Sequence, residues 1–360
     1  MRQLRMLVTA RFARNEIERV RTQIGDVDFA GYGVTGKIMA EEDLIRKLEG
    51  IDIFIHEFES VTRRVIEASK ALALVGCCRT GPEASVDIAA ATERGIPVLY
   101  TPGRNAISVA EYTLGLMLAV ARHIAEAHHL LRYTSALTRV HYEDKSPDRL
   151  AVTSEWSLDP TAPFNVLQGP ELHGKTIGLV GFGAIGREIA KRARAFGMEV
   201  AAYDPYISDE VASAWQAKLL SLEDLAAQAD FVVMAAKVTP QTTGLVSRAV
   251  LSLMKPTAYF INTARAALVD YDGLFEVLKV RRIAGAALDV YPQEPIPDDD
   301  RFRTLDNVLL SPHLAGASFD IPAHHSRIMM EAVALALAGS QPQWIANPDA
   351  WKSRRLGARA

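Results

Sequence analysis

Short apolar runs alternate with amphipathic stretches along the first hundred residues. Such runs are typical of buried strands, and the stretches between them have the 3.6-residue spacing of helices. The predicted strands are Arg5–Ala10, Ile51–His56, Ala71–Cys77 and Ile96–Thr101, and the predicted helices are Glu41–Glu49, Val61–Ser69 and Ser85–Arg94. This alternation predicts an α/β layer built on a mostly parallel sheet.

After the first hundred residues, the alternation of strands and helices is interrupted, and it resumes at Thr176. One long apolar helix is predicted from about Ser108 to Leu131, and Tyr133 to Pro170 lacks periodicity. A loop of that length is usually functional or part of an oligomer arm. A second series predicts strands at Thr176–Gly181, Glu199–Tyr203, Asp230–Ala235, Ala258–Thr263, Ile283–Val290 and Asn307–Leu310, with helices at Ile185–Phe196, Leu222–Gln228, Arg248–Met254, Tyr271–Lys279 and Phe319–Leu337. We therefore expect two α/β units.

Composition and charge narrow the class of protein. At 360 residues, with 49% hydrophobic and 23% charged residues, the chain has enough apolar material for about two domains. The formal net charge of -3 gives no reason to expect a nucleic-acid or anionic-membrane partner. The only cysteines, Cys77 and Cys78, are adjacent, which argues against a disulfide scaffold and favours a reducing, cytoplasmic location. No signal peptide, membrane span or metal site is expected.

The glycine pattern GxGxxG occurs twice, and by itself it is a weak signal. The first occurrence is Gly31, Gly33 and Gly36. It follows a short run broken by charges, Asp26 to Ala30, and the next helical pattern begins only at about Glu41. A glycine-rich loop is the favoured interpretation there.

The second occurrence has the context of a dinucleotide-binding turn. Gly181, Gly183 and Gly186 follow an uninterrupted buried-strand run, and an amphipathic helix begins within the motif. Glycines allow the backbone to turn tightly and to approach a pyrophosphate at the helix N-terminus. The next strand ends at Asp204, whose carboxylate can accept hydrogen bonds from ribose hydroxyls and would repel a 2′-phosphate. The motif predicts binding of NAD in preference to NADP.

Three polar residues follow strands of the second unit. Arg265, Glu294 and His313 come after the strands predicted at 258–263, 283–290 and 307–310. Each alone has an ordinary explanation, as a surface ion-pair partner, a solvated acid or a strand-end histidine. Because ligands of an open α/β sheet bind beyond the carboxyl ends of its strands, their shared position favours a catalytic set.

Together these side chains suit the reduction of a 2-oxo acid. The guanidinium of Arg265 can bind a carboxylate bidentately and keeps its charge. His313 can exchange a proton near neutral pH. A carboxylate from Glu294 against the other ring nitrogen would select the tautomer and favour the imidazolium. The sequence thus predicts hydride transfer between NAD(H) and a small 2-hydroxy acid, with the protein supplying placement.

Several stretches resemble the D-2-hydroxyacid dehydrogenase family, which includes phosphoglycerate and glycerate dehydrogenases. They lie between about Val75 and Gly316 and comprise 105–111, 174–176, 262–265, 294–295 and 311–316. The resemblance implies a D-specific enzyme in which Arg265 holds the substrate, Glu294 partners the histidine and His313 is the acid/base. It also implies cofactor contacts at Gly181, Gly183, Ala184, Ile185, Gly186, Asp204, Thr263, Ala264, Asp289 and Gly316.

The resemblance also implies the domain order. An NAD-binding Rossmann domain at 104–317 would interrupt a discontinuous substrate domain, 1–103 plus 318–360. Both would be Rossmann-like or flavodoxin-like, with the active-site cleft between them and Asn105 in the cleft. Members are commonly dimeric through the NAD-binding domain, so a homodimer is expected, with the loop at 133–170 extending a dimer arm.

Two departures from the family pattern bear on the site. Ala266 stands where a glycine usually follows the arginine, a change that we expect to be tolerated. In the substrate-binding loop, which includes Thr80 and Gly81, Arg79 places a cation where many members have an apolar residue. Arg79 is expected either to contact a second polar or anionic group of the substrate, or to face solvent or pair with Glu83.

Two other functions share this fold. A formate dehydrogenase pairs a glutamine with the histidine, and Glu294 argues against that reaction. An NAD-responsive transcriptional corepressor without significant turnover can retain all three catalytic residues. The absence of long disordered or motif-bearing extensions argues against this second alternative.

Overall fold

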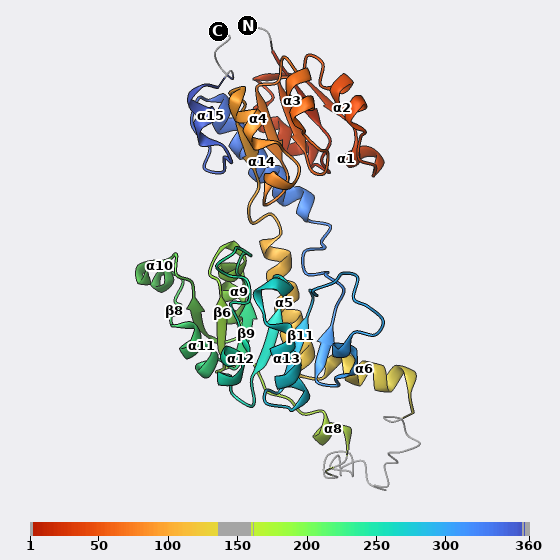
Figure 1. Ribbon diagram of the computed structural model, residues 1–360, viewed down its shortest axis with the longest axis vertical. Helices are drawn as coiled ribbons and strands as arrows, with labels where there is room; N and C mark the ends of the chain where they lie inside the picture. Colours follow the sequence, from red (N-terminus) through yellow and green to blue (C-terminus); the bar gives the residue numbers. More distant parts are fainter. Residues whose placement is uncertain (1–2, 136–159, 161, 355, 357–360) are drawn as a thin grey trace, which may run out of the picture. The chain divides into compact units, whose positions relative to one another are not determined.

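A computed structural model describes residues 3–135, 160, 162–354 and 356 (Figure 1). The chain divides into two compact units, here called unit 1 (residues 1–105 and 318–360) and unit 2 (residues 106–317). The sequence placed the first boundary at residue 103 and the second at residue 317. Each unit is built on one parallel sheet, so the expected α/β fold class with two parallel-sheet domains is confirmed.

Unit 1 has five parallel strands in the order β2-β1-β3-β4-β5. These are β1 (Leu4–Val8), β2 (Ile24–Phe29), β3 (Ile53–His56), β4 (Leu74–Cys77) and β5 (Val98–Tyr100). Helices α2 (Glu41–Lys47), α3 (Arg63–Ala68) and α4 (Ile88–Glu93) cover one face, and the 3-10 helix η1 (Arg14–Val20) and α14 (Ile321–Leu337) cover the other. Because both faces are covered, the inner strands are mostly apolar, with Arg5 near the start of β1 and His56 at the end of β3 as the exceptions. Shorter helices are α1 (Tyr32–Thr35), η2 (Pro82–Ala84) and α15 (Pro348–Lys352).

The sequence analysis predicted no strand at residues 26–30, whereas residues 26–29 belong to strand β2 and Ala30 directly follows it. Asp26 and Asp28 are tolerated since β2 is an edge strand with only one fully buried residue. The glycines after it still have packing roles. Gly31 has φ +59, and a Cβ on Gly33 would lie 2.0 Å from the carbonyl oxygen of Ala10. These requirements support the interpretation of a glycine-rich loop that packs on the end of β1.

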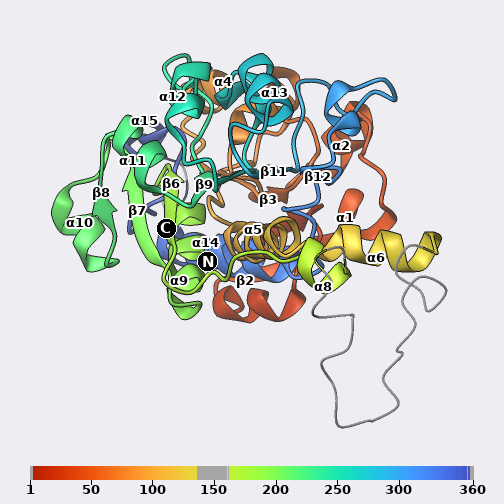
Figure 2. The same ribbon diagram turned by 90° about the horizontal axis from the view of Figure 1, so that it is seen from below.

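Unit 2 has seven parallel strands in the order β12-β11-β10-β9-β6-β7-β8. These are β6 (Thr176–Val180), β7 (Glu199–Tyr203), β8 (Lys218–Leu219), β9 (Phe231–Met234), β10 (Tyr259–Asn262), β11 (Gly285–Leu288) and β12 (Val308–Leu310). Helices α5 (Ala106–Ala121), α9 (Ala184–Ala195) and α10 (Asp209–Ala214) pack on one face, and α11 (Leu222–Gln228), α12 (Arg248–Leu253) and α13 (Tyr271–Lys279) on the other (Figure 2). The 3-10 helices η3 (Ala266–Leu268) and η4 (Arg301–Thr304) lie in loops.

The single helix predicted from Ser108 to Leu131 is two helices. The second, α6 (Ile124–Tyr133), follows His123, whose φ of 51° breaks the helical path, and the pair is bent by 64°. Among the described residues, no single helix is long and apolar enough to cross a membrane. Most of the loop expected at 133–170 lies outside the described residues, and α8 (Pro163–Val166) is a short helix near its end.

Candidate functional site

The carboxyl edge of the sheet in unit 2 collects the residues that the sequence singled out. Strand β6 lies between β7 on one side and β9 on the other, so the chain changes direction across the sheet at β6. This is the switch point at which open α/β sheets bind ligands. The loops after β6, β7, β10, β11 and β12 all leave this edge because every strand is parallel.

In the glycine turn after β6, backbone segments approach one another so closely that two of the glycines leave no room for a side chain. Gly181 has φ +101, and a Cβ there would lie 2.6 Å from the backbone nitrogen of Ala236. A Cβ on Gly186 would lie 2.5 Å from the carbonyl oxygen of Gly181. Gly183 has nothing within 4 Å of its Cβ position, and it is the N-cap of α9 without a side-chain cap. The N–H groups at the start of α9, which begins with Ala184 and Ile185, are therefore open to a pyrophosphate.

Asp204 lies beside this turn at the end of β7. Its Oδ2 accepts a hydrogen bond from the backbone N–H of Phe182 at 2.8 Å, and its Oδ1 accepts one from that of Tyr206 at 3.0 Å. No ion pair with a lysine or arginine is recorded for Asp204 within the described part of the chain. The carboxylate is thus fixed in direction and adjacent to the glycine turn, as the recognition of a ribose by NAD-binding sites requires.

The loop after β10 presents Arg265. The side chain of Asn262 accepts a hydrogen bond from the N–H of Ala264 at 3.0 Å and donates one to the carbonyl of Arg265 at 3.1 Å. The hydroxyl of Thr263 lies 2.8 Å from that of Thr113 on α5, and both residues are buried. Arg265 itself is exposed and donates only to the carbonyl of Ala264, at 2.6 Å. The rest of its guanidinium has no recorded partner among the described residues.

Ala266, the departure from the usual glycine, begins η3. It is not among the residues with positive φ. Its backbone therefore does not need the conformational freedom of glycine.

The loops after β11 and β12 bring Glu294 and His313 together. The Nδ1 atom of His313 lies 2.6 Å from Oε2 of Glu294, and Oε1 of Glu294 accepts the N–H of Tyr291 at 3.0 Å. Burial acts to raise the pKa of Glu294, but the contacts with His313 and Tyr291 and the charge of Arg265 outweigh it, so this pKa is lowered. His313 and Glu294 are thus in direct contact, and the charge of Arg265 acts on the same carboxylate.

Asp289 holds the loop that carries His313. It is fully buried, and its oxygens accept hydrogen bonds from the hydroxyl of Ser311 at 2.6 Å and from the N–H groups of Leu314 and Ala315 at 2.8 Å. His313 has φ 56°, a conformation that non-glycine residues adopt only when their surroundings impose it. Sequence reasoning assigned Asp289 to the cofactor and missed this supporting role, because the three donors lie at least 22 residues away.

The predicted substrate-binding residues belong to unit 1. Arg79, Thr80 and Gly81 follow β4, and Asn105 is the last residue before the chain enters unit 2. The expected alternative of an ion pair between Arg79 and Glu83 is not present in the described residues; the guanidinium instead lies 5.2 Å from the ring centre of Phe58.

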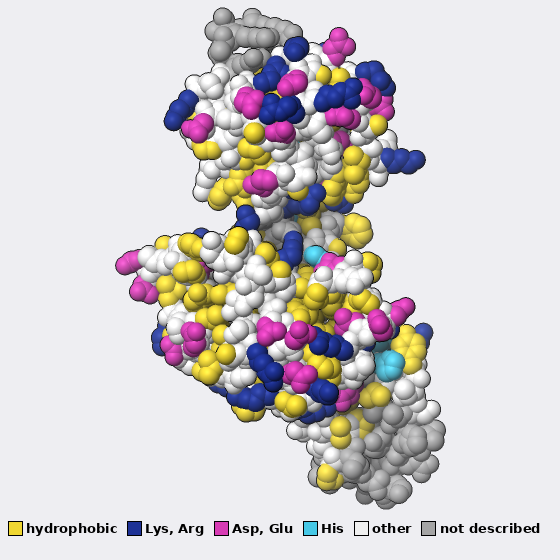
Figure 3. Space-filling view, in the orientation of Figure 1, with side chains coloured by type: hydrophobic (Ala, Val, Ile, Leu, Met, Phe, Trp, Pro, Cys, Tyr) yellow, Lys and Arg dark blue, Asp and Glu magenta, His cyan; other side chains and the backbone are white. Residues whose placement is uncertain are grey.

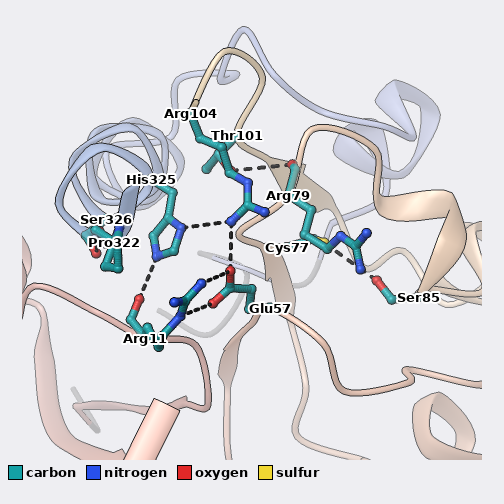
Figure 4. Close-up of polar contacts among 10 residues, drawn as sticks. All are labelled: Arg11, Glu57, Cys77, Arg79, Ser85, Thr101, Arg104, Pro322, His325 and Ser326. Carbon is teal, nitrogen blue, oxygen red and sulfur yellow. Dashed lines mark hydrogen bonds and ion pairs between the residues drawn. The ribbon is translucent and has the colours of Figure 1, made fainter. Parts of the chain in front are cut away.

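The sequence analysis did not single out four residues of unit 1 whose side chains contact one another: Arg11, Glu57, Arg104 and His325 (Figure 4). Glu57 follows the strand predicted at 51–56, so the argument from strand ends could have found it. Arg104 precedes Asn105, which begins one of the stretches that carry the family resemblance.

Comparisons with known proteins agree with this arrangement. Residues 114–315 match the family model described as the NAD-binding domain of D-isomer specific 2-hydroxyacid dehydrogenases. YoaD of Bacillus subtilis, named as a 2-hydroxyacid dehydrogenase, is 36% identical over 331 residues, which cover 91% of this chain and 89% of YoaD. The D-3-phosphoglycerate dehydrogenase of Methanocaldococcus jannaschii is 34% identical over 98% of this chain, which spans 61% of that relative.

A solved structure extends the likeness to the fold. The crystal structure of the TT0316 protein from Thermus thermophilus is 31% identical with a TM-score of 0.68, over 95% of this chain and all of that one. The glycine turn, Asp204 and the pair of Glu294 with His313 give the match a chemical basis. The chain belongs to the D-isomer-specific 2-hydroxyacid dehydrogenase family, and it is an NAD-linked oxidoreductase of hydroxyacids.

Proposed function

We propose that Arg265, Glu294 and His313 are the catalytic residues for interconversion of a 2-oxo acid and its D-2-hydroxy acid. The observation that carries this proposal is the 2.6 Å contact between His313 and Glu294, within reach of the charge of Arg265. All three leave the carboxyl edge of the sheet that carries the glycine turn. A proton donor, a carboxylate clamp and a dinucleotide turn are the parts that this reaction requires.

The glycine turn and Asp204 fit NAD. The open N–H groups after Gly183 would hold the pyrophosphate, and Asp204 would accept hydrogen bonds from the ribose hydroxyls. When bound, the nicotinamide supplies or accepts the hydride. Thr263, Ala264, Asp289 and Gly316 remain proposed contacts of the same cofactor. NADP is disfavoured because its 2′-phosphate would meet the Asp204 carboxylate.

Side chains of the protein bind the substrate carboxylate and transfer the proton. Arg265 holds the substrate carboxylate through the guanidinium N–H groups that lack a recorded partner. Because Nδ1 of His313 faces Glu294, Nε2 is the ring atom that can give a proton to the substrate carbonyl oxygen. Glu294 stabilises the protonated ring before transfer and selects the neutral tautomer afterwards.

Unit 1 is proposed to be the substrate domain, with Arg79, Thr80, Gly81 and Asn105 as substrate-binding residues. We also propose a homodimer and a cytoplasmic location, the latter supported by two buried free cysteines. No nucleic-acid or membrane partner is proposed, since the net charge is -3 and basic and acidic side chains are interspersed on the visible face (Figure 3). The alternative of a corepressor without turnover gains no support from the comparisons.

The test is NADH oxidation with a panel of 2-oxo acids, using wild type, His313→Asn and the control His173→Ala. His173 is exposed and precedes β6, at the opposite edge of the sheet. Turnover should fall by about 10²–10⁴-fold in His313→Asn, with NADH affinity kept, and should be unchanged in the control. Tight NADH binding without turnover of any 2-oxo acid in wild type would contradict the proposal.

A further inference from the structure

A hydrogen bond joins α5 to the loop that carries Arg265, although the two are far apart in the chain. Oγ1 of Thr113 on α5 lies 2.8 Å from Oγ1 of Thr263, 150 residues later. Thr113 is fully buried and Thr263 is 5% exposed, so both hydroxyls are shielded from water. Both residues belong to unit 2, where α5 packs on one face of the sheet (Figure 2). The contact therefore lies inside one compact unit.

The direction of this hydrogen bond follows from a second acceptor. Oγ1 of Thr113 also lies 2.7 Å from the carbonyl oxygen of Val109, one turn earlier in α5. A carbonyl oxygen has no proton to donate and a hydroxyl has only one, so the proton of Thr113 points to Val109. The proton between the two hydroxyls therefore belongs to Thr263. Thr263 is the donor, and the oxygen of Thr113 is the acceptor.

Thr113 supports this loop from outside. Within the described part of the chain, it is the only recorded hydrogen-bond partner of residues 263–265 from beyond residues 262–268. The other recorded bonds of residues 263–265 run within 262–268 itself, chiefly to the side chain of Asn262. Internal bonds fix the shape of the loop. The bond to Thr113 is the one that ties this shape to a neighbouring helix.

The position of the Arg265 guanidinium depends on the loop backbone more than on contacts of its own side chain. Arg265 is exposed, and its side chain donates only to the carbonyl of the preceding Ala264, with no further recorded partner among the described residues. A shift of the loop therefore moves the guanidinium with it. Bidentate binding of a carboxylate requires two N–H groups to point at two oxygens, so a small shift weakens this binding.

We propose that Thr113 is a positioning residue for Arg265, which it holds through the hydroxyl of Thr263 in the orientation that binds the substrate carboxylate. The inference rests on the proposed function, in which Arg265 binds that carboxylate. Thr113 acts through Thr263 and not on the substrate. Residues that lock a binding side chain in place contribute to affinity without a contact of their own. Loss of one buried hydroxyl on α5 should therefore weaken substrate binding.

The test measures KM and kcat for the best 2-oxo acid of the panel at saturating NADH, together with the denaturant midpoint of unfolding. Thr113→Val removes the acceptor and keeps the shape of the side chain, whereas Thr113→Ser keeps the hydroxyl. The double variant Thr113→Val/Thr263→Val replaces both hydroxyls by methyl groups and leaves no buried donor unpaired. Ser252→Ala is the matched control, because this exposed hydroxyl on α12 also donates to a carbonyl one turn earlier, that of Arg248.

Thr113→Val should raise KM by about 3–10-fold, the size expected for one lost hydrogen bond, and should lower the denaturant midpoint. Its kcat should change by less than about twofold, because Arg265 holds the carboxylate in the bound substrate and in the transition state alike. Thr113→Ser should keep KM within about twofold of wild type. In the double variant the midpoint should recover toward wild type while KM stays raised. Ser252→Ala should leave KM unchanged.

An unchanged KM in Thr113→Val, an equal rise in Thr113→Ser, or a KM that recovers with the midpoint in the double variant would overturn the inference. The hydroxyl pair would then serve stability alone.

Arg265→Lys separates this failure from failure of the proposed function. A raised KM in Arg265→Lys beside an unchanged KM in Thr113→Val would overturn the role of Thr113 and leave that of Arg265 intact. Oxamate, a 2-oxo acid analogue that is not reduced, allows the same comparison by calorimetry with NADH present and without turnover. If wild type neither turns over a 2-oxo acid nor binds oxamate, the proposed function and the inference are both overturned.

Discussion

His313 and Glu294 are 19 residues apart in the chain, yet Nδ1 of one lies 2.6 Å from Oε2 of the other. They meet because β11 and β12 are adjacent parallel strands whose carboxyl ends leave the sheet side by side. The pair is partly exposed, with side-chain accessibilities of 41% and 35%. A substrate can therefore reach the ring nitrogen that does not face the carboxylate.

Replacing Glu294 by Gln should change the pH dependence of kcat/KM more than it changes the fold. The pKa of Glu294 lies below its ordinary value, so its carboxylate is ionised throughout the neutral range and stabilises the protonated ring of His313. Without that charge, the pH at which kcat/KM for 2-oxo acid reduction falls should be lower by about one unit. Glu276→Gln, on α13, is the control. An unshifted limb with a uniformly lower rate would mean that Glu294 acts only through position.

Asp289→Ala should reduce both stability and turnover. The change leaves three donors in the His313 loop without their acceptor, at a cost of about 2–4 kcal/mol of unfolding free energy. Denaturant unfolding and kcat measure the two effects. Asp306→Ala removes only an exposed pair with Arg281 and should cost less than about 0.5 kcal/mol. A fully stable Asp289→Ala protein that lost only NADH affinity would favour a cofactor role instead.

Asp204→Ala should weaken the discrimination between NADH and NADPH. The change removes the carboxylate that would accept from the ribose and repel the 2′-phosphate, so NADH affinity should fall by about tenfold and NADPH affinity should rise. Quenching of protein fluorescence by each dinucleotide gives the two dissociation constants. Asp209→Ala, in the first turn of α10, should leave both unchanged. Parallel losses for both dinucleotides would show that Asp204 only supports the turn.

Two buried histidines should make the protein less stable as the pH falls below about 6.5. Burial lowers the pKa of His56 to about 3 and that of His325 to about 4. Between these values and the unfolded value of 6.5, the unfolded chain binds more protons, so unfolding free energy decreases with decreasing pH. Each histidine contributes up to about 1.4 kcal/mol per pH unit within its window.

His56→Phe should remove one of these contributions, because His56 is stacked on Phe54 and a phenyl ring can keep that packing. Chemical denaturation at pH 7 and at pH 5 should show a smaller difference for the variant than for wild type. The exposed His128, changed to Phe, should leave the difference as it is. If unfolding free energy differs between pH 7 and pH 5 by the same amount in His56→Phe as in wild type, His56 does not contribute to the loss of stability at low pH.

The local sequence pattern was sufficient to predict most of the strands and helices of both units. The helices at 222–228 and 271–279 were predicted with the observed bounds, since apolar spacing and capping residues are both local. Strand β2 was missed because an edge strand tolerates charges on its exposed positions. The break at His123 was missed because a single residue with positive φ leaves no trace in hydrophobic periodicity.

The sequence by itself determined the glycine turn after β6, the position of Asp204 at the end of the next strand, and the positions of Arg265, Glu294 and His313 after strands of the same sheet. Each of these depends on neighbours in the chain or on the general geometry of parallel sheets. Only the tertiary structure decided which atoms are in contact. Examples are the hydrogen bonds from the His313 loop to Asp289 and those from Arg11 and Arg104 to Glu57. Such contacts join residues up to 314 positions apart, and their geometry depends on strand order and packing, which no local pattern specifies.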